Sequence, residues 1–159
     1  SKESFLFSIN MSMLKYFFDI KKADENRKLF KNLYIEKTET FKEQGQYPVV
    51  FLSLKDLKAT TWEEMERKII IILSDFFSEY EYLLNELTGI SFENLKNIIY
   101  RKADIDELTT TLKFLTKILY EKYNKKVVVL IDEYDSPLVS AYINGYYGKA
   151  SLRLFIVQY

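Results

Sequence analysis

The stretch that decides the predicted fold is Val127-Val128-Val129-Leu130-Ile131-Asp132-Glu133. Five apolar residues, four of them β-branched, end abruptly in two carboxylates. Such a run is too short for an isolated helix. It predicts a strand buried on both faces, as in a parallel sheet that helices cover. The carboxylates then lie at the carboxyl end of a central strand, the edge where open α/β sheets place their ligands.

An apolar strand that ends in Asp-Glu is the Walker B pattern of nucleotide hydrolases. In that interpretation Asp132 holds Mg²⁺ on a nucleotide phosphate, and Glu133 orients or polarises the attacking water. The spacing alone equally fits a core strand whose end meets solvent at two charged residues.

The composition sets the class of protein. With 159 residues, 48% of them apolar, the chain is one domain or part of one and has enough apolar residues for a core. Lys+Arg and Asp+Glu both number 23, so the charge does not indicate a nucleic acid or an anionic membrane as partner. The partners stay unknown.

Two missing residue types narrow the chemistry. Without cysteine there is no disulfide framework and no zinc-thiolate site, and without histidine there is no Ser-His-Asp or Cys-His catalysis. A metal would have to be a hard, oxygen-bound cation such as Mg²⁺. The longest apolar run, 69–73, is far below the ~20 residues of a membrane span, and the start of the sequence has no signal-peptide layout. We expect a cytoplasmic protein without a membrane segment.

Hydrophobic periodicity and turn signals predict alternating strands and helices, and hence an α/β fold with a mainly parallel sheet. Thr61 and Glu64 form a capping box before the clearest helical pattern, and Asp104 is a second cap. The expected strands are 4–8, 49–54 and 127–132. The expected helices are 10–19, 24–34, 61–80, 91–100, 104–119 and one that begins at Ser136-Pro137.

A Walker B carboxylate needs a phosphate-binding loop beside it, with the pattern G-x-x-x-x-G-K-[ST] between a strand and a helix. The place for it is between Phe7 and Met13. No glycine precedes Gly45, and no Gly-Lys-[Ser/Thr] occurs in the chain. The sequence therefore carries the metal-and-water part of a nucleotide hydrolase and lacks the phosphate-binding part.

Three blocks in order, 9–18, 47–56 and 129–138, resemble the bacterial AAA-ATPase-like family, and 144–147 looks like its continuation. The resemblance covers about 5–147 and leaves 148–159 as an unmatched tail that reads as strand-like from Ser151 to Val157. It implies a partial P-loop NTPase domain of the three-layer α/β/α type, with ATP and Mg²⁺ as ligands. Family members often carry a PD-(D/E)XK nuclease-like domain in the same chain.

The same resemblance implies that Asp132 is the Mg²⁺ carboxylate and Glu133 the water-polarising one; Asp135 matches the motif without an assigned role. Family members place an Arg-rich loop ending in Phe-Gly-Lys-[Ser/Thr] directly before the Asn-Met-Ser-Met-Leu helix. Here Phe5-Leu6-Phe7-Ser8 runs straight into Ile9-Asn10-Met11, as though that loop had been excised. We therefore expect an incomplete domain over 1–159, with impaired ATP binding and no identifiable Walker A residue.

Two other functions fit the residues. The chain could be a non-catalytic interaction module, or a truncated remnant of such an ATPase.

Asp56 with Glu66-Arg67-Lys68 also mimics a nuclease pattern. However, Glu66 and Lys68 lie in the predicted helix 61–80, where residues two apart point to different faces. We interpret them as a solvated helix surface, and we find no nucleic-acid footprint.

Overall fold

The computed structural model describes residues 2–108 and 110–154, which form two compact units. The first unit comprises the described part of 1–52 and 114–132, and the second comprises the described part of 53–113 and 133–159. Each unit is described by itself below.

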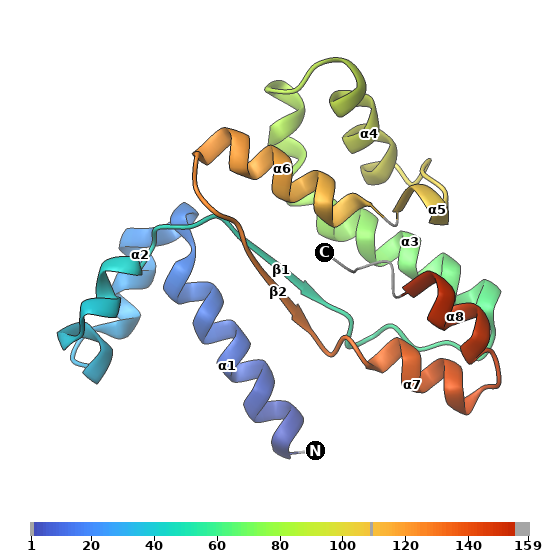
Figure 1. Cartoon of the computed structure of the whole chain (residues 1–159), viewed down its shortest axis with the longest axis horizontal. Coiled ribbons are helices and arrows are strands. Elements are labelled where there is room, and N and C mark those ends of the chain that lie inside the picture. The colour runs from blue at the N-terminus through green and yellow to red at the C-terminus, as the bar shows by residue number, and fades with distance from the viewer. Residues whose placement is uncertain (1, 109, 155–159) are drawn as a thin grey trace. The chain divides into compact units, whose positions relative to one another are not determined.

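Helices dominate both units (Figure 1). The elements of the first unit are α1 (Lys2–Phe18), η1 (Ile20–Lys22), α2 (Ala23–Arg27), η2 (Lys28–Phe30), η3 (Tyr34–Lys37), η4 (Glu39–Glu43), β1 (Val49–Ser53), most of α6 (Thr111–Tyr123) and β2 (Val128–Asp132). Those of the second are α3 (Trp62–Ser78), η5 (Glu81–Asn85), α4 (Gly89–Ile99), α5 (Ile105–Leu108), α7 (Ser136–Ile143) and α8 (Tyr147–Leu154).

The two strands pair in parallel, so the predicted α/β class and the predicted parallel pairing are confirmed. The amide of Val128 donates to the carbonyl of Pro48 at 3.0 Å, just before β1, and α1 packs against β2 (Figure 1). The prediction that β2 is buried on both faces was too strong. Within β2 only Leu130 and Asp132 are buried, because the sheet of the described residues has two strands and covers little surface.

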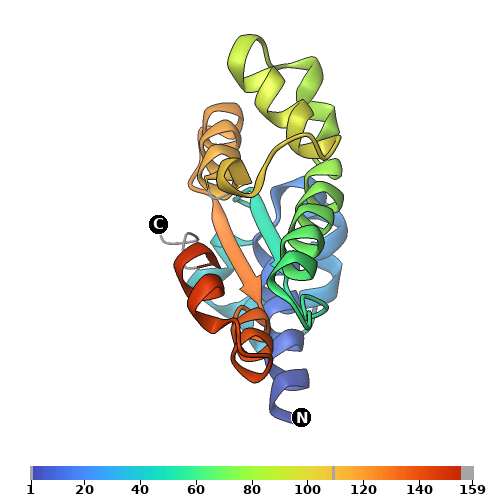
Figure 2. The same ribbon diagram turned by 90° about the vertical axis from the view of Figure 1, so that its right-hand side faces the viewer.

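Two strand predictions were wrong. Residues 4–8 belong to α1, because no glycine or proline separates them from the helical pattern that follows. Residues 151–154 belong to α8, which packs against α7 (Figure 2). Ala150, the residue before them in α8, is buried. Residues 155–157, also predicted as strand-like, lie outside the described residues.

The helix predicted over 104–119 is divided into α5 and α6. Asp104 forms the expected cap, and its carboxylate accepts from the amide of Glu107 at 2.8 Å. The carboxylate of Glu107 accepts in turn from the amide of Asp104 at 2.9 Å. The hydroxyl of Thr111 donates to the carbonyl of Leu108 at 2.8 Å. Threonine hydroxyls that bond nearby carbonyls in this way compete with the helical hydrogen bonds, so the helix restarts there.

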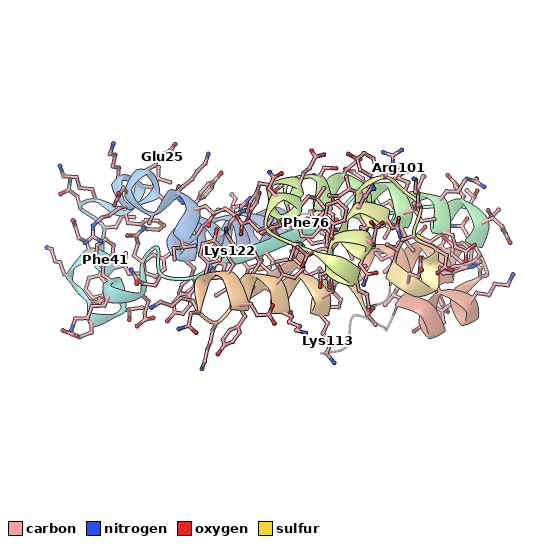
Figure 3. The ribbon with its side chains drawn as sticks, turned by 90° about the horizontal axis from the view of Figure 1, so that it is seen from above. Glu25, Phe41, Phe76, Arg101, Lys113 and Lys122 are labelled. Atoms are coloured by element: carbon pink, nitrogen blue, oxygen red, sulfur yellow. The ribbon has the colours of Figure 1, made fainter. Side chains whose placement is uncertain are left out.

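Three phenylalanines form the core of the N-terminal part of the first unit. Phe17, Phe30 and Phe41 are all buried, and the ring of Phe17 meets that of Phe30 edge-on at 5.2 Å. The guanidinium of Arg27 lies 4.6 Å from the centre of the Phe41 ring. Figure 3 shows Phe41 among the short helices, whereas Glu25 points outward. Of the apolar residues predicted for helix 24–34, Phe30 is buried, but Leu29 and Leu33 are exposed.

Gly45 allows the chain to turn back onto this core. Its φ is +69°, a left-handed conformation, and its amide donates to the carbonyl of Phe17 at 2.8 Å. A Cβ at this position would lie 2.4 Å from the Cβ of Ala23 and 3.0 Å from its Cα. Gly45 is therefore required by both the backbone conformation and the lack of space.

We expect Gly45→Ala to lower the free energy of unfolding by about 2–5 kcal/mol, the sum of left-handed strain and overpacking. Chemical denaturation followed by circular dichroism measures this. The double change Gly45→Ala, Ala23→Gly should recover part of the loss, since it removes the closest contact. Full stability in the single variant would contradict this packing.

In the second unit, α4 and α5 both pack against α3. Arg101, which follows α4 with a φ of +57°, connects the two longer helices (Figure 3). Its side chain donates to the hydroxyl of Ser74 at 3.3 Å and to the carboxylate of Asp75 at 3.0 Å. The buried Ser74 hydroxyl donates in turn to the carbonyl of Ile99 at 2.6 Å. These bonds offset the cost of a non-glycine residue in the left-handed region.

Candidate functional site

Asp132 is the last residue of β2, as the sequence predicted. Its side chain is 5% exposed, although it is a carboxylate. Aspartate is seldom buried to this extent without partners or a metal, because removal of a charge from water is costly. Asp132 is therefore a buried carboxylate at the end of a strand whose other residues, 128–131, are all apolar.

Glu133 follows directly and has a φ of +52°. The left-handed region costs a non-glycine residue about 1–2 kcal/mol, and glutamate has no particular tolerance for it. The carbonyl of Glu133 accepts from the amide of Ser136 at 3.1 Å, which closes a tight turn before α7. Among the described residues, Asn32, Arg101 and Asn124 also have positive φ. Asparagine tolerates this conformation, and Arg101 is held by its hydrogen bonds. Strained backbone of this kind is concentrated at functional sites.

The helix after the turn begins as predicted. Pro137 occupies the first turn of α7 and is buried, and Asp135 precedes the helix as its N-cap residue. Asp135 is exposed, and its carboxylate makes no capping hydrogen bond. The structure thus assigns Asp135 no role beyond its place in the motif.

The residues of the nuclease-like pattern lie on two separate segments. Glu66 and Lys68 both lie in α3, as predicted, and Asp56 is an exposed residue of the segment after β1. Lys68 is used locally: its ammonium lies 2.8 Å from the carboxylate of Glu64. The interpretation of these residues as a solvated helix surface is consistent with this arrangement.

The donor set at Asp132 suits a hard cation. Among the side chains that the structure describes, no group of three or more acidic residues is placed to hold a metal ion. Mg²⁺ does not need one, since it is usually bound by one or two carboxylates together with waters and substrate phosphates.

The described helices are also too short or too polar to cross a bilayer.

A cluster that the sequence analysis missed lies in the second unit. The side chains of Ser140, Asn144 and Tyr146 all make hydrogen bonds to the backbone of Ala59. We call these four residues the Ala59 cluster. The contact joins residues 81 to 87 positions apart, so no local pattern could reveal it. The only signal was the family likeness of 144–147.

These features define the class of protein: an α/β protein with a parallel sheet and an Asp-Glu pair at the end of a strand. The model of the AAA-ATPase-like family, described as a predicted AAA-ATPase, matches residues 5–159. The chain therefore belongs to this family, as its motifs indicated. The match includes 148–159, the residues that the motif comparison left unmatched. No curated protein and no solved structure matches the chain significantly.

Proposed function

We propose that this chain is part of an ATP-binding and ATP-hydrolysing domain, in which Asp132 holds Mg²⁺ and Glu133 polarises the attacking water. The observation that supports this is the buried carboxylate of Asp132 at the carboxyl end of a strand in a parallel sheet. Open α/β sheets bind their ligands at this edge. When bound, Mg²⁺ would offset the charge that develops on the phosphate oxygens.

Glu133 contributes a carboxylate next to this position. A carboxylate can accept a proton from water or orient it by a hydrogen bond. Its strained backbone is a cost that a purely structural turn would avoid by having glycine there. The chain thus retains a charged side chain at the position where the backbone favours glycine.

The chain differs from its family where the phosphate-binding loop is expected. Phe5-Leu6-Phe7-Ser8 takes the place where family members have Phe-Gly-Lys-[Ser/Thr], so an amide-rich turn and a lysine ammonium are missing there. Each charge-assisted hydrogen bond to a phosphate is worth about 1.5–3 kcal/mol. We expect the chain to bind Mg-ATP more weakly than micromolar. This same observation favours the alternative, a non-catalytic interaction module.

Isothermal titration with Mg-ATP separates the two functions. Phe5 and Ser8 already match the family pattern, so Leu6→Gly with Phe7→Lys restores its last part. This double variant should bind Mg-ATP at least about tenfold more tightly than the unaltered chain. One hydrogen bond between the lysine ammonium and a phosphate is enough to lower the dissociation constant by that factor. The matched control is Leu6→Gly with Phe7→Gln, which lacks the charge and should show little gain.

The gain should also depend on the acidic residue. Adding Asp132→Asn to the double variant should remove the Mg²⁺-dependent part of the affinity while the circular dichroism spectrum stays the same. If the double variant gains nothing over its glutamine control, the interaction module is the better account. Micromolar binding by the unaltered chain would show that other residues supply the phosphate contacts.

A further inference from the structure

The Ala59 cluster holds one backbone position with three side chains. The carbonyl of Ala59 accepts from the hydroxyl of Tyr146 at 2.7 Å, the hydroxyl of Ser140 at 3.0 Å and the side-chain amide of Asn144 at 3.3 Å. The amide of Ala59 donates to the same Ser140 hydroxyl at 3.0 Å. Ala59 is 5% exposed, whereas Ser140 and Tyr146 are half-buried and Asn144 is exposed, so these bonds are partly shielded from water. Loss of a partner for such buried groups is costly.

The residues on both sides of Ala59 are held as well, in this case by α3. The carboxylate of Glu64 accepts from the amide of Thr60 at 2.9 Å, and the ammonium of Lys68 donates to the carbonyl of Lys58 at 2.6 Å. The hydrogen bond from Lys68, followed by those from Thr60, lowers the pKa of Glu64 to about 2. Three successive residues, 58–60, are therefore held by side chains from α3 and from residues 140–146.

On the other side, the cluster is connected to Glu133 through α7. Glu133 closes the turn before this helix, Ser140 lies within the helix, and Asn144 and Tyr146 follow it. The amide of Tyr146 donates to the carbonyl of Ala141 at 3.0 Å, which holds this segment against the helix end. An eight-residue helix is a rigid connector of about 12 Å. Glu133 and the Ala59 cluster thus lie near opposite ends of one rigid element.

We propose that Ser140, Asn144 and Tyr146 are positioning residues, which join residues 58–60 and the segment carrying Glu133 into one body. They set the position of Glu133, and a ligand that moves Glu133 also moves 58–60. The inference rests on the proposed function only in that Mg-ATP is taken as the ligand. The coupling between 58–60 and the segment carrying Glu133 does not depend on the proposed function.

The chain contains its own probe of this coupling. Trp62 is its single tryptophan, it is 7% exposed, and its ring centre lies 6.4 Å from that of Tyr146. A displacement of α7 and the residues after it changes the surroundings of the indole. Tryptophan fluorescence therefore reports on the Ala59 cluster without a label.

The first test needs no ligand. Tyr146→Phe keeps the ring against Trp62 and removes one hydrogen bond. Such a bond is worth about 1 kcal/mol, which corresponds to a change of about fivefold in the equilibrium constant for local opening of the backbone. We expect amide hydrogen exchange, measured by NMR, to become about fivefold faster at both Ala59 and Ser136. The control is Tyr142→Phe, which removes a hydroxyl from an exposed ring of α7 and should leave both amides unchanged.

Faster exchange at only one of the two amides, or an equal effect in Tyr142→Phe, would overturn the coupling. Ser140→Ala is the stronger second variant, because it removes the partner of both the amide and the carbonyl of Ala59. It should accelerate the same two amides more than Tyr146→Phe does. Unchanged exchange in both variants would likewise overturn the coupling.

The second test uses Mg-ATP and the Leu6→Gly, Phe7→Lys variant. Binding measured by calorimetry should be accompanied by a change in Trp62 fluorescence, and Tyr146→Phe should reduce that change without a matching loss of affinity. Binding without any fluorescence change would overturn the transmission to 58–60 and leave the proposed function intact. Absence of binding would contradict the proposed function, while the exchange experiment still decides the coupling.

Discussion

Replacement of Phe77 by alanine is expected to lower the free energy of unfolding by about 3–5 kcal/mol. The side chain is fully buried in the second unit, and its ring meets that of Phe76 edge-on at 5.3 Å and that of Tyr80 at 6.4 Å. Its removal leaves a cavity that the rigid backbone of α3 cannot close. The cost is therefore the lost burial of the ring together with the lost contacts around it. Urea denaturation monitored by circular dichroism measures the change.

Two variants show whether the effect comes from the cavity. Phe77→Leu fills most of the space and should cost less than half as much. Ile90→Ala removes an apolar side chain that is 80% exposed in the same unit, and should stay within about 0.5 kcal/mol of the parent. If Phe77→Ala costs no more than Ile90→Ala, the second unit has no tightly packed core around α3.

The sequence predicted α3 well because several signals agreed. The hydroxyl of Thr61 accepts from the amide of Glu64 at 3.2 Å, as the capping box required, although the Glu64 carboxylate reaches the amide of Thr60 and not that of Thr61. The helical spacing of apolar residues between 61 and 80 predicts a stripe that faces the core. Its members Trp62, Met65, Ile69, Phe76 and Tyr80 are buried, and Ile72 and Leu73 are half-buried. Phe77 was missing from that stripe. Because α4 and α5 both pack on α3, the buried face is wider than one helical stripe.

The errors concern short segments whose structure depends on their neighbours. Residues 4–8 and 151–154 are apolar enough for a strand, but a strand needs a partner and a helix does not. Once helix 10–18 forms, residues 4–8 extend it at little cost. The burial of β2 was overestimated for a related reason, since periodicity cannot report how many strands and helices cover a sheet.

The sequence predicted that Asp132 and Glu133 lie at the end of a strand, but not the conformation of Glu133. The position of Asp132 followed from an apolar run that stops at a carboxylate, and its burial agrees with that. The left-handed backbone of Glu133 could not be inferred, because no turn residue such as glycine or asparagine marks it. The Ala59 cluster depends on side chains that meet only after the whole second unit has folded.

Glu133 is the residue for which we predict the largest change in turnover. Its conservative variant Glu133→Gln keeps the size of the side chain and the left-handed backbone, and removes only the negative charge. If Glu133 polarises the attacking water, the loss removes one general-base contribution, typically a factor of about 10² to 10⁴. Binding of Mg-ATP should change little, since in the proposed arrangement Asp132, not Glu133, holds the metal.

The experiment uses the Leu6→Gly, Phe7→Lys protein as parent and measures phosphate release and Mg-ATP affinity side by side. Glu133→Gln should lose turnover with nearly unchanged affinity, whereas Asp132→Asn should lose both. Asp135→Asn, a change of an exposed carboxylate two residues further on, should leave turnover near that of the parent. Equal losses in the Glu133 and Asp135 variants would mean that local charge, and not a specific base, supports the reaction. Turnover that survives Glu133→Gln would remove the water-polarising role, and the strain at Glu133 would then reflect only the turn into α7.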